Sequence, residues 1–117
     1  MRNGLSKDLI ARVLGGAPKY TLDELEAKFP QRQLPEGAQV SRVAPSPTGF
    51  MHLGTLYQMM IAKKLAQQSN GVFMLRIEDT DTKREVDGAV DVILKCAKSF
   101  NLIPDEGPEY GGEYGPY

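Results

Sequence analysis

The sequence predicts an α/β fold built on a parallel β-sheet and preceded by a short helical leader. Between residues 39 and 102, short β-prone runs alternate with longer segments of helical spacing, in the order strand, helix, strand, helix. Parallel strands need a crossover of about this length, which is usually a helix. The run at residues 72–77 is apolar except for Arg76, as is typical of a strand covered on both faces.

The leader, residues 1–37, is predicted to hold two short helices. The first runs over residues 6–13 and ends at a glycine pair. Thr21 and Glu24 have the spacing of a capping box, which opens a second helix extending to about Lys28. Its apolar residues, at helical spacing, are Leu22, Leu25 and Phe29. We expect both helices to pack on the main body.

The main body, residues 38–117, is predicted as two strands and two helices followed by an irregular loop. The predicted strands are residues 40–44 and 72–77, and the predicted helices are residues 53–68 and 85–101, with Asn70-Gly71 ending the first helix. The candidate core contacts are Leu53, Leu56, Met60 and Leu65 on the first helix and Val86, Val90, Ile93, Leu94 and Ala97 on the second. Residues 104–117 are rich in Gly, Pro and acids. So small a sheet would leave an exposed edge, so we expect the chain to be part of something longer.

Composition limits the possible functions. The chain has 117 residues, and 14 Lys plus Arg stand against 15 Asp plus Glu, a net charge of -1. Because this is no basic excess, we expect any polyanion to be held mostly by parts outside this chain. The single cysteine, Cys96, excludes an internal disulfide and a zinc site with paired cysteines, and we expect it to be a small buried hydrophobe.

Location is also constrained by the sequence. The chain has no stretch of about 20 apolar residues, so no membrane span is expected. Asp8 and Arg12 interrupt the apolar start and argue against a signal peptide. A cytoplasmic location is therefore expected.

The candidate ligand site follows the first predicted strand. Residues 44–55 read APSPTGFMHLGT, in which two prolines and a glycine impose a non-helical path. His52, Gly54 and Thr55 then stand at a helix N-terminus, where free N–H groups and the helix dipole favour an anion. Open α/β sheets bind ligands at this carboxyl end of a strand. A lone histidine at a helix start is nevertheless most often a capping or surface residue.

Three ordered blocks extend this interpretation. Residues 42–49 read RVAPSPTG and are followed by HLGT at 52–55, LRIEDTD at 75–81, DEGP at 105–108 and YGPY at 114–117. These blocks resemble the glutamyl-tRNA synthetases, of the class I aminoacyl-tRNA synthetases, over residues 38–117. Thr55 stands where the family's HIGH signature ends in His. The resemblance implies the first half of a Rossmann-like nucleotide-binding catalytic domain.

The resemblance also implies residue roles. It implies L-glutamate contacts from Arg42, Ala44, Ser46, Glu78 and Tyr57, although Tyr57 is equally compatible with packing. It implies ATP binding and catalysis by His52, Gly54 and Thr55. Arg84 would reach the tRNA acceptor end, unless it is simply a solvated surface arginine.

In this interpretation the protein itself has no metal site. Magnesium would arrive with ATP, and no zinc is expected in this chain. Strand alternation would place Glu78 and Asp79 on opposite faces, so a metal site formed by them with Asp81 is not expected.

The implied activity is ATP-dependent activation of L-glutamate and its transfer to tRNA-Glu. The family's second motif, KMSKS, has no match here, so the isolated chain is expected to be nearly inactive. The nearest competing function is that of a glutamyl-queuosine tRNA-Asp synthetase. The sequence is also compatible with a non-catalytic nucleotide- or glutamate-binding module and with a structural fragment whose site is unformed.

Overall fold

The computed structural model describes residues 11–13, 15–16, 19–80 and 86–117. The chain divides into two compact units, residues 1–32 and 33–117. Each unit has its own secondary structure.

In the first unit, the predicted capping box is confirmed at helix α2 (Leu22–Lys28). The Thr21 backbone N–H donates to Glu24 Oε2 over 2.7 Å, and the Glu24 N–H donates to Thr21 Oγ1 over 3.2 Å. These hydrogen bonds to Thr21, the backbone one first, lower the pKa of Glu24. Leu22 is 77% exposed, and no residue of α2 is buried. The capping box therefore stabilises α2, whereas side-chain burial contributes little to this helix. Of the first predicted helix, residues 11–13 are helical and residues 6–10 lie outside the described part.

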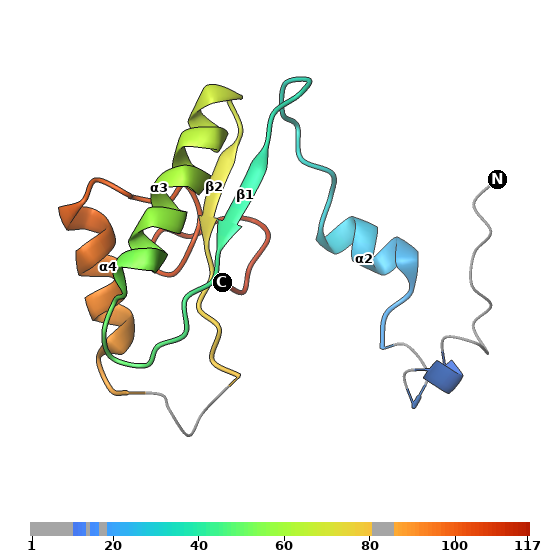
Figure 1. Ribbon diagram of the computed structural model, residues 1–117. Coiled ribbons are helices and arrows are strands. Elements are labelled where there is room, and N and C mark those ends of the chain that lie inside the picture. The colour runs from blue at the N-terminus through green and yellow to red at the C-terminus, as the bar shows by residue number, and fades with distance from the viewer. Residues whose placement is uncertain (1–10, 14, 17–18, 81–85) are drawn as a thin grey trace. The chain divides into compact units, whose positions relative to one another are not determined.

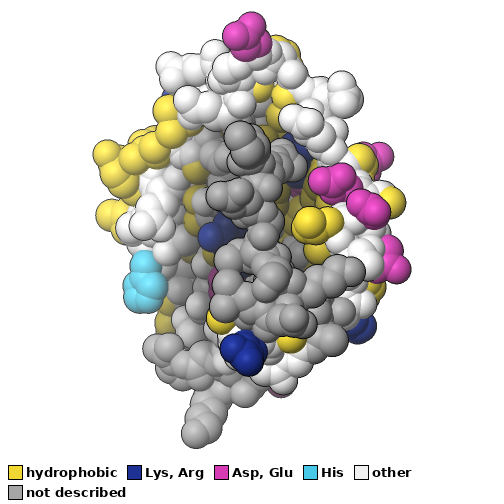
Figure 2. All heavy atoms as spheres, turned by 90° about the vertical axis from the view of Figure 1, so that its right-hand side faces the viewer, with side chains coloured by type: hydrophobic (Ala, Val, Ile, Leu, Met, Phe, Trp, Pro, Cys, Tyr) yellow, Lys and Arg dark blue, Asp and Glu magenta, His cyan; other side chains and the backbone are white. Residues whose placement is uncertain are grey.

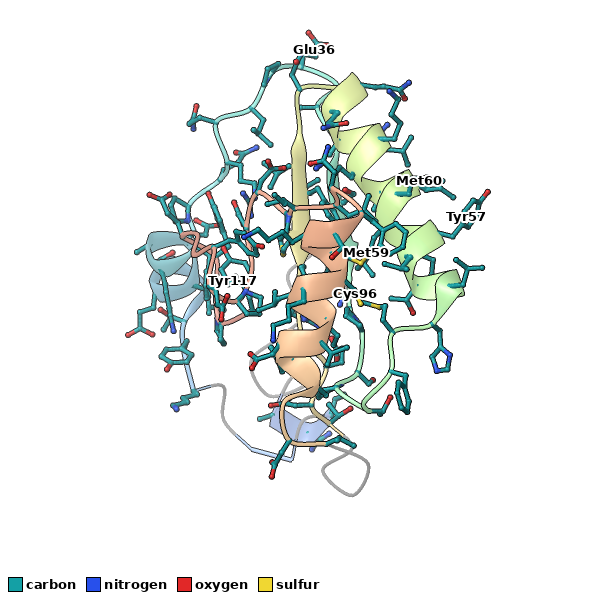
Figure 3. All side chains as sticks on the ribbon, turned by 90° about the vertical axis from the view of Figure 1, so that its left-hand side faces the viewer. Glu36, Tyr57, Met59, Met60, Cys96 and Tyr117 are labelled. Carbon is teal, nitrogen blue, oxygen red and sulfur yellow. The ribbon has the colours of Figure 1, made fainter. Side chains whose placement is uncertain are left out.

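The second unit is a parallel βαβ unit followed by a helix, as predicted. Strand β1 (Val40–Val43) leads through helix α3 (Leu53–Gln68) into strand β2 (Val72–Leu75), and helix α4 (Ala89–Ser99) follows. The strands pair in parallel with Val40 opposite Val72 and Val43 opposite Leu75. Figures 1 and 3 show α3 and α4 on the same side of the two strands.

The core lies between the strands and these two helices. Its buried members are Val43, Met59, Ala62, Ala66, Phe73, Leu75, Ile93, Leu94, Ala97 and Leu102. In β2, Phe73 and Leu75 are buried, whereas Val72 and Met74 on the other face are half-buried. The expectation of a strand covered on both faces is therefore wrong for the described residues, because both helices pack on one face. The strand is also shorter than predicted, ending at Leu75.

The predicted core face of α3 is wrong. Leu53, Met60 and Leu65 are 80%, 50% and 42% exposed. Figure 3 shows Met59 pointing toward α4 and Met60 pointing away. The buried residues of α3 are Met59, Ala62 and Ala66. Of the predicted contacts, Leu56 is partly buried against the core.

Small side chains explain this orientation of α3. Alanines at 62 and 66 permit a close approach to β1, where the Ser41 hydroxyl donates to the Ala62 carbonyl over 2.8 Å. A face of larger leucines and methionines would hold the helix farther from the sheet. The close approach of the α3 and β1 backbones therefore explains why the face of α3 with the small residues is the buried one.

The predicted core face of α4 is confirmed in part. Ile93, Leu94 and Ala97 are buried, and Val90 packs partly against the core. Val86 is 49% exposed, because α4 begins at Ala89 and Val86 precedes it. Gly88 occupies the N-cap with φ +77°, a conformation that favours glycine. Cys96 is half-buried rather than buried as expected, since it lies beside the buried stripe of α4.

The predicted stop at Asn70-Gly71 is confirmed. Asn70 adopts a left-handed conformation with φ +53°. The Gly71 N–H donates to the Ala66 carbonyl over 2.8 Å, and the Asn70 N–H donates to the Gln67 carbonyl over 3.5 Å. This pair of bonds is a Schellman motif, which satisfies carbonyls left free by the end of the helix.

Residues 105–106 cover the outer edge of β2. The Phe73 N–H donates to Asp105 Oδ2 over 2.8 Å, and the Asp105 N–H donates back to the Phe73 carbonyl over 2.9 Å. The Leu75 N–H donates to the Glu106 carbonyl over 2.9 Å. The segment predicted as a plain loop thus shields one sheet edge, which proteins otherwise leave vulnerable to pairing with other chains.

No helix in the described part of the chain has the length and apolar character needed to cross a membrane.

Candidate functional site

The loop that leaves β1 is tied to the segment that leaves β2. The Arg76 N–H donates to the Val43 carbonyl over 3.0 Å, and the Glu78 N–H donates to the Pro45 carbonyl over 3.1 Å. Because proline fixes φ and has no N–H of its own, the loop turns away from a regular strand here. These bonds hold Glu78 beside Ala44 and Ser46, which are half-buried and exposed respectively.

The α3 N-terminus follows this loop. His52 is the N-cap residue, and its carbonyl accepts the Thr55 and Leu56 N–H groups over 3.0 and 3.2 Å. Its side chain makes no capping bond. The single histidine is exposed in Figure 2. No acidic side chain occupies the first turn of α3. The free N–H groups of this turn therefore face no negative side chain of their own helix, which favours an external anion.

A hollow of about 230 Å³ lies beside this helix start. It is lined by Pro45, Ser46, Thr48, Phe50, Met51, His52, Thr55 and Ile93. Three predicted site residues (Ser46, His52 and Thr55) are thereby brought together.

Two other predicted site residues, Gly54 and Tyr57, do not line this hollow. They line a different, mostly apolar hollow of about 590 Å³ with Leu53, Leu56, Met60, Phe100 and Leu102. Tyr57 is 60% exposed and points away from the core in Figure 3.

A cluster of three charged side chains lies at the carboxyl ends of both strands. Arg42 Nη1 donates to Glu78 Oε1 over 3.2 Å, and Arg76 Nε donates to the same oxygen over 3.1 Å. Arg76 Nη2 also forms an ion pair with it. The hydrogen bond from Arg76 and its positive charge lower the pKa of Glu78 most, with smaller contributions from Arg42.

Sequence reasoning missed Arg76. Residues two apart in an extended segment share a face, so the spacing of Arg76 and Glu78 was the available signal. Arg42 joins them because its register partner on β2 is Met74, two residues before Arg76.

A hollow of about 360 Å³ lies against this cluster and is lined by Arg76, Ile77, Glu78, Asp79, Pro116 and Tyr117. Glu78 and Asp79 line it together, contrary to the expected separation, because β2 ends at Leu75 and strict alternation stops there. The Tyr117 hydroxyl donates to Glu106 Oε2 over 2.9 Å and accepts the Tyr114 N–H over 3.0 Å. The YGPY segment is thereby held against the cluster.

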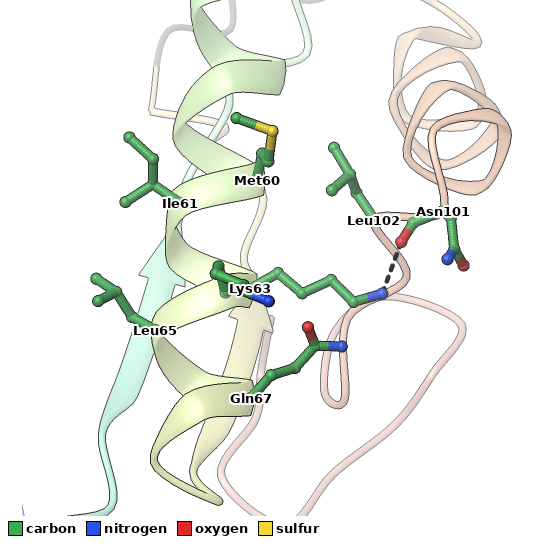
Figure 4. Close-up of a pocket in the computed structure, with 8 residues that line it drawn as sticks. Met60, Ile61, Lys63, Leu65, Gln67, Asn101 and Leu102 are labelled. Carbon is green, nitrogen blue, oxygen red and sulfur yellow. Dashed lines mark hydrogen bonds between the residues drawn. The ribbon is translucent and has the colours of Figure 1, made fainter.

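A further groove of about 490 Å³ runs along the far part of α3 (Figure 4). Lys63 Nζ donates to the Asn101 carbonyl across it over 2.7 Å. No predicted site residue lines this groove. Arg84 and Asp81 lie outside the described residues, and among the described residues no group of three His, Cys, Asp or Glu side chains could hold a metal ion.

The parallel βαβ unit, with polar side chains at the carboxyl end of β1 and an anion-favouring helix start behind them, defines the beginning of a Rossmann-like α/β domain. Residues 39–116 match the family of class I tRNA synthetases (E and Q), catalytic domain. The chain belongs to this family.

Individual relatives agree with this assignment. The chain is 59% identical over 92 residues to a glutamate–tRNA ligase of Acetivibrio thermocellus, covering 76% of the chain and 17% of the relative. It is 44% identical over 117 residues to that of Clostridium beijerinckii, covering 97% and 21%. The chain thus spans about a fifth of the length of these curated relatives.

Solved structures show the same fold. The crystal structure of glutamate-tRNA synthetase from Elizabethkingia anophelis superposes with a TM-score of 0.66 at 42% identity, covering 68% of this chain and 16% of that chain. A glutamate tRNA ligase from Elizabethkingia meningosepticum, solved in complex with its amino acid, gives 0.65 at 44% identity, covering 70% and 16%.

Proposed function

We propose that residues 38–117 supply the first half of the active site of a glutamate–tRNA ligase, which activates L-glutamate with ATP and transfers it to tRNA-Glu in the cytoplasm. The observation that carries this proposal is the cluster of Arg42, Arg76 and Glu78 at the carboxyl ends of the strands. The relatives named glutamate–tRNA ligase support the choice of reaction.

The charges of the cluster suit glutamate. Two guanidinium groups and one carboxylate give it a net charge of +1, opposite to the -1 of free glutamate at neutral pH. Glu78 would accept the ammonium group, and Arg42 would bind a carboxylate as a planar two-donor fork. Ala44 and Ser46 would line the same pocket. The assignment of Tyr57 to this pocket stays a prediction.

The start of α3 suits the ATP phosphates. His52 would donate to a phosphate oxygen, Gly54 would let the nucleotide approach the backbone, and Thr55 would hydrogen-bond it. The glutamate carboxylate attacks the α-phosphate, forming the adenylate and expelling pyrophosphate. No nucleophilic side chain is required. These residues orient the reactants and stabilise developing phosphate charge, and magnesium would arrive with ATP.

The proposal places tRNA contact mainly in regions outside this chain, with Arg84 as a contact to the acceptor end. Because the chain supplies only one wall of the site, we expect it to bind a non-hydrolysable glutamyl-adenylate analogue weakly, with a Kd on the order of 1 mM. It would prefer this analogue over the glutaminyl one and would show no aminoacylation.

Calorimetry with both analogues, together with an aminoacylation assay, tests this. Equal or reversed preference would contradict the assignment to glutamate. Submicromolar binding would instead indicate a self-sufficient binding module, and complete absence of binding an unformed site. Robust turnover would overturn the half-site proposal. Charging of tRNA-Asp rather than tRNA-Glu by the product of the complete reading frame would favour the queuosine-modifying function.

A further inference from the structure

Three nitrogen atoms converge on one oxygen of Glu78. Arg76 contributes both Nε and Nη2, and Arg42 contributes Nη1, all to Oε1. Among the described residues, no hydrogen bond reaches Oε2. One carboxylate oxygen is therefore fully committed, and the other remains available as an acceptor.

Arg42 has two roles in the proposed arrangement. In the structure it donates to Glu78, but the proposed function requires its planar fork to bind a substrate carboxylate. Arg42 has one bond to Glu78, whereas Arg76 has two. Arg76 can therefore keep the carboxylate in place after Arg42 has turned to the substrate.

We propose that Arg76 is a positioning residue for the amino-acid pocket, holding Glu78 through Oε1 so that Oε2 receives the substrate ammonium group. This inference rests on the proposed function. Arg76 does not itself contact the substrate in this arrangement. It also balances the charge of Glu78, so that Arg42 is left as the uncompensated cation that attracts a second carboxylate.

The surroundings are consistent with this division of roles. Among the described residues, the charged groups beside Glu78 are Arg42 from β1, Arg76 before it in the chain and Asp79, which lines the same hollow. Tyr117 lines the same hollow, but its hydroxyl is bonded to Glu106. Arg76 is also the main cause of the lowered pKa of Glu78. Removing it would raise that pKa toward its usual value, so more of the carboxyl would be protonated at mildly acid pH.

The test compares four variants of the 117-residue chain: Arg76→Gln, Arg76→Lys, Arg42→Gln and, as a control for lost charge, Lys95→Gln on the exposed side of α4. Carbon-detected NMR follows the Glu78 carboxyl through a pH titration, and calorimetry measures binding of the glutamyl-adenylate analogue. We expect Arg76→Gln to raise the pKa of Glu78 more than Arg42→Gln does. We also expect it to weaken analogue binding on the order of tenfold, the loss of a hydrogen bond to a charged group.

The lysine variant separates charge from geometry. Arg76→Lys keeps a cation but not the two-donor edge, so we expect it to retain most of the pKa shift and only part of the affinity. Lys95→Gln is expected to change neither quantity. If the wild-type chain binds the analogue but Arg76→Gln changes neither the affinity nor the pKa of Glu78, the positioning role of Arg76 is wrong and the proposed function is unaffected. A wild-type chain that binds no analogue would overturn the proposed function and the substrate role of Arg76 with it.

Discussion

Gly71 shows how a single residue sets the spacing of the βαβ unit. A Cβ atom at this position would lie 1.9 Å from the Gln39 carbonyl oxygen, which is far inside van der Waals contact. The Val72 N–H donates to the same oxygen over 3.0 Å. Because Gly71 has no side chain, the turn after α3 can pass directly against Gln39, the residue that precedes β1.

We predict that Gly71→Ala lowers the free energy of unfolding by about 1–3 kcal/mol, the usual range for overpacking. Urea unfolding followed by circular dichroism measures it. The control is Gly54→Ala, since a Cβ there meets nothing within 4 Å. The same loss in both variants would contradict a steric cause specific to Gly71.

At the scale of elements, α3 carries apolar residues on two faces. One face packs on the sheet, and the other exposes Leu53, Tyr57, Met60, Ile61 and Leu65. Helical spacing alone fits both faces, so periodicity predicted the wrong one. The adjacent residues Met59 and Met60 make a matched pair, being 0% and 50% exposed.

We therefore predict that Met59→Ala costs about 2–5 kcal/mol of unfolding free energy, the range for a cavity left by a buried methionine. Met60→Ala is expected to cost less than about 1 kcal/mol, because that side chain remains half in water. Chemical denaturation of both variants checks this. A larger loss for Met60→Ala would show that the exposed face of α3 is the packed one.

At the scale of the whole second unit, the C-terminal segment covers one edge of the sheet. Asp105 lies 32 positions after Phe73 and bonds to its backbone through both its side chain and its own N–H. Gly107 lies so close to Leu75 that a Cβ would be 2.8 Å from the Leu75 carbonyl oxygen. The DEGP block thus has a structural role besides marking the family.

We predict that Asp105→Ala lowers the unfolding free energy by about 1–3 kcal/mol, because the Phe73 N–H loses a charged acceptor. Asp105→Asn keeps an acceptor oxygen and is expected to lose less. Amide hydrogen exchange gives a local readout, with faster exchange at Phe73 in the alanine variant. Unchanged exchange there would show that this hydrogen bond does not protect the edge of β2.

Much of the candidate site was predictable from residues close together in sequence. Arg42, Ser46, His52, Thr55 and Glu78 were identified from their blocks. The structure places Ser46, His52 and Thr55 around one hollow and Glu78 at another, where Arg42 donates to it. Arg76 was missed as a site residue because its importance depends on where Glu78 points. That orientation is set beyond β2, where the Glu78 N–H donates to the Pro45 carbonyl of the other strand's loop.

The sequence by itself determined the local and ordered features of this protein: the Thr21–Glu24 cap, the stop at Asn70-Gly71, the strand–helix–strand order and the family blocks. Each depends on backbone conformation or on side chains a few residues apart. Only the tertiary structure decided which face of α3 is buried, that Arg42 meets Glu78 36 positions away, and that Asp105 covers β2. These arrangements depend on the close approach of distant backbone segments, which spacing along the chain does not encode.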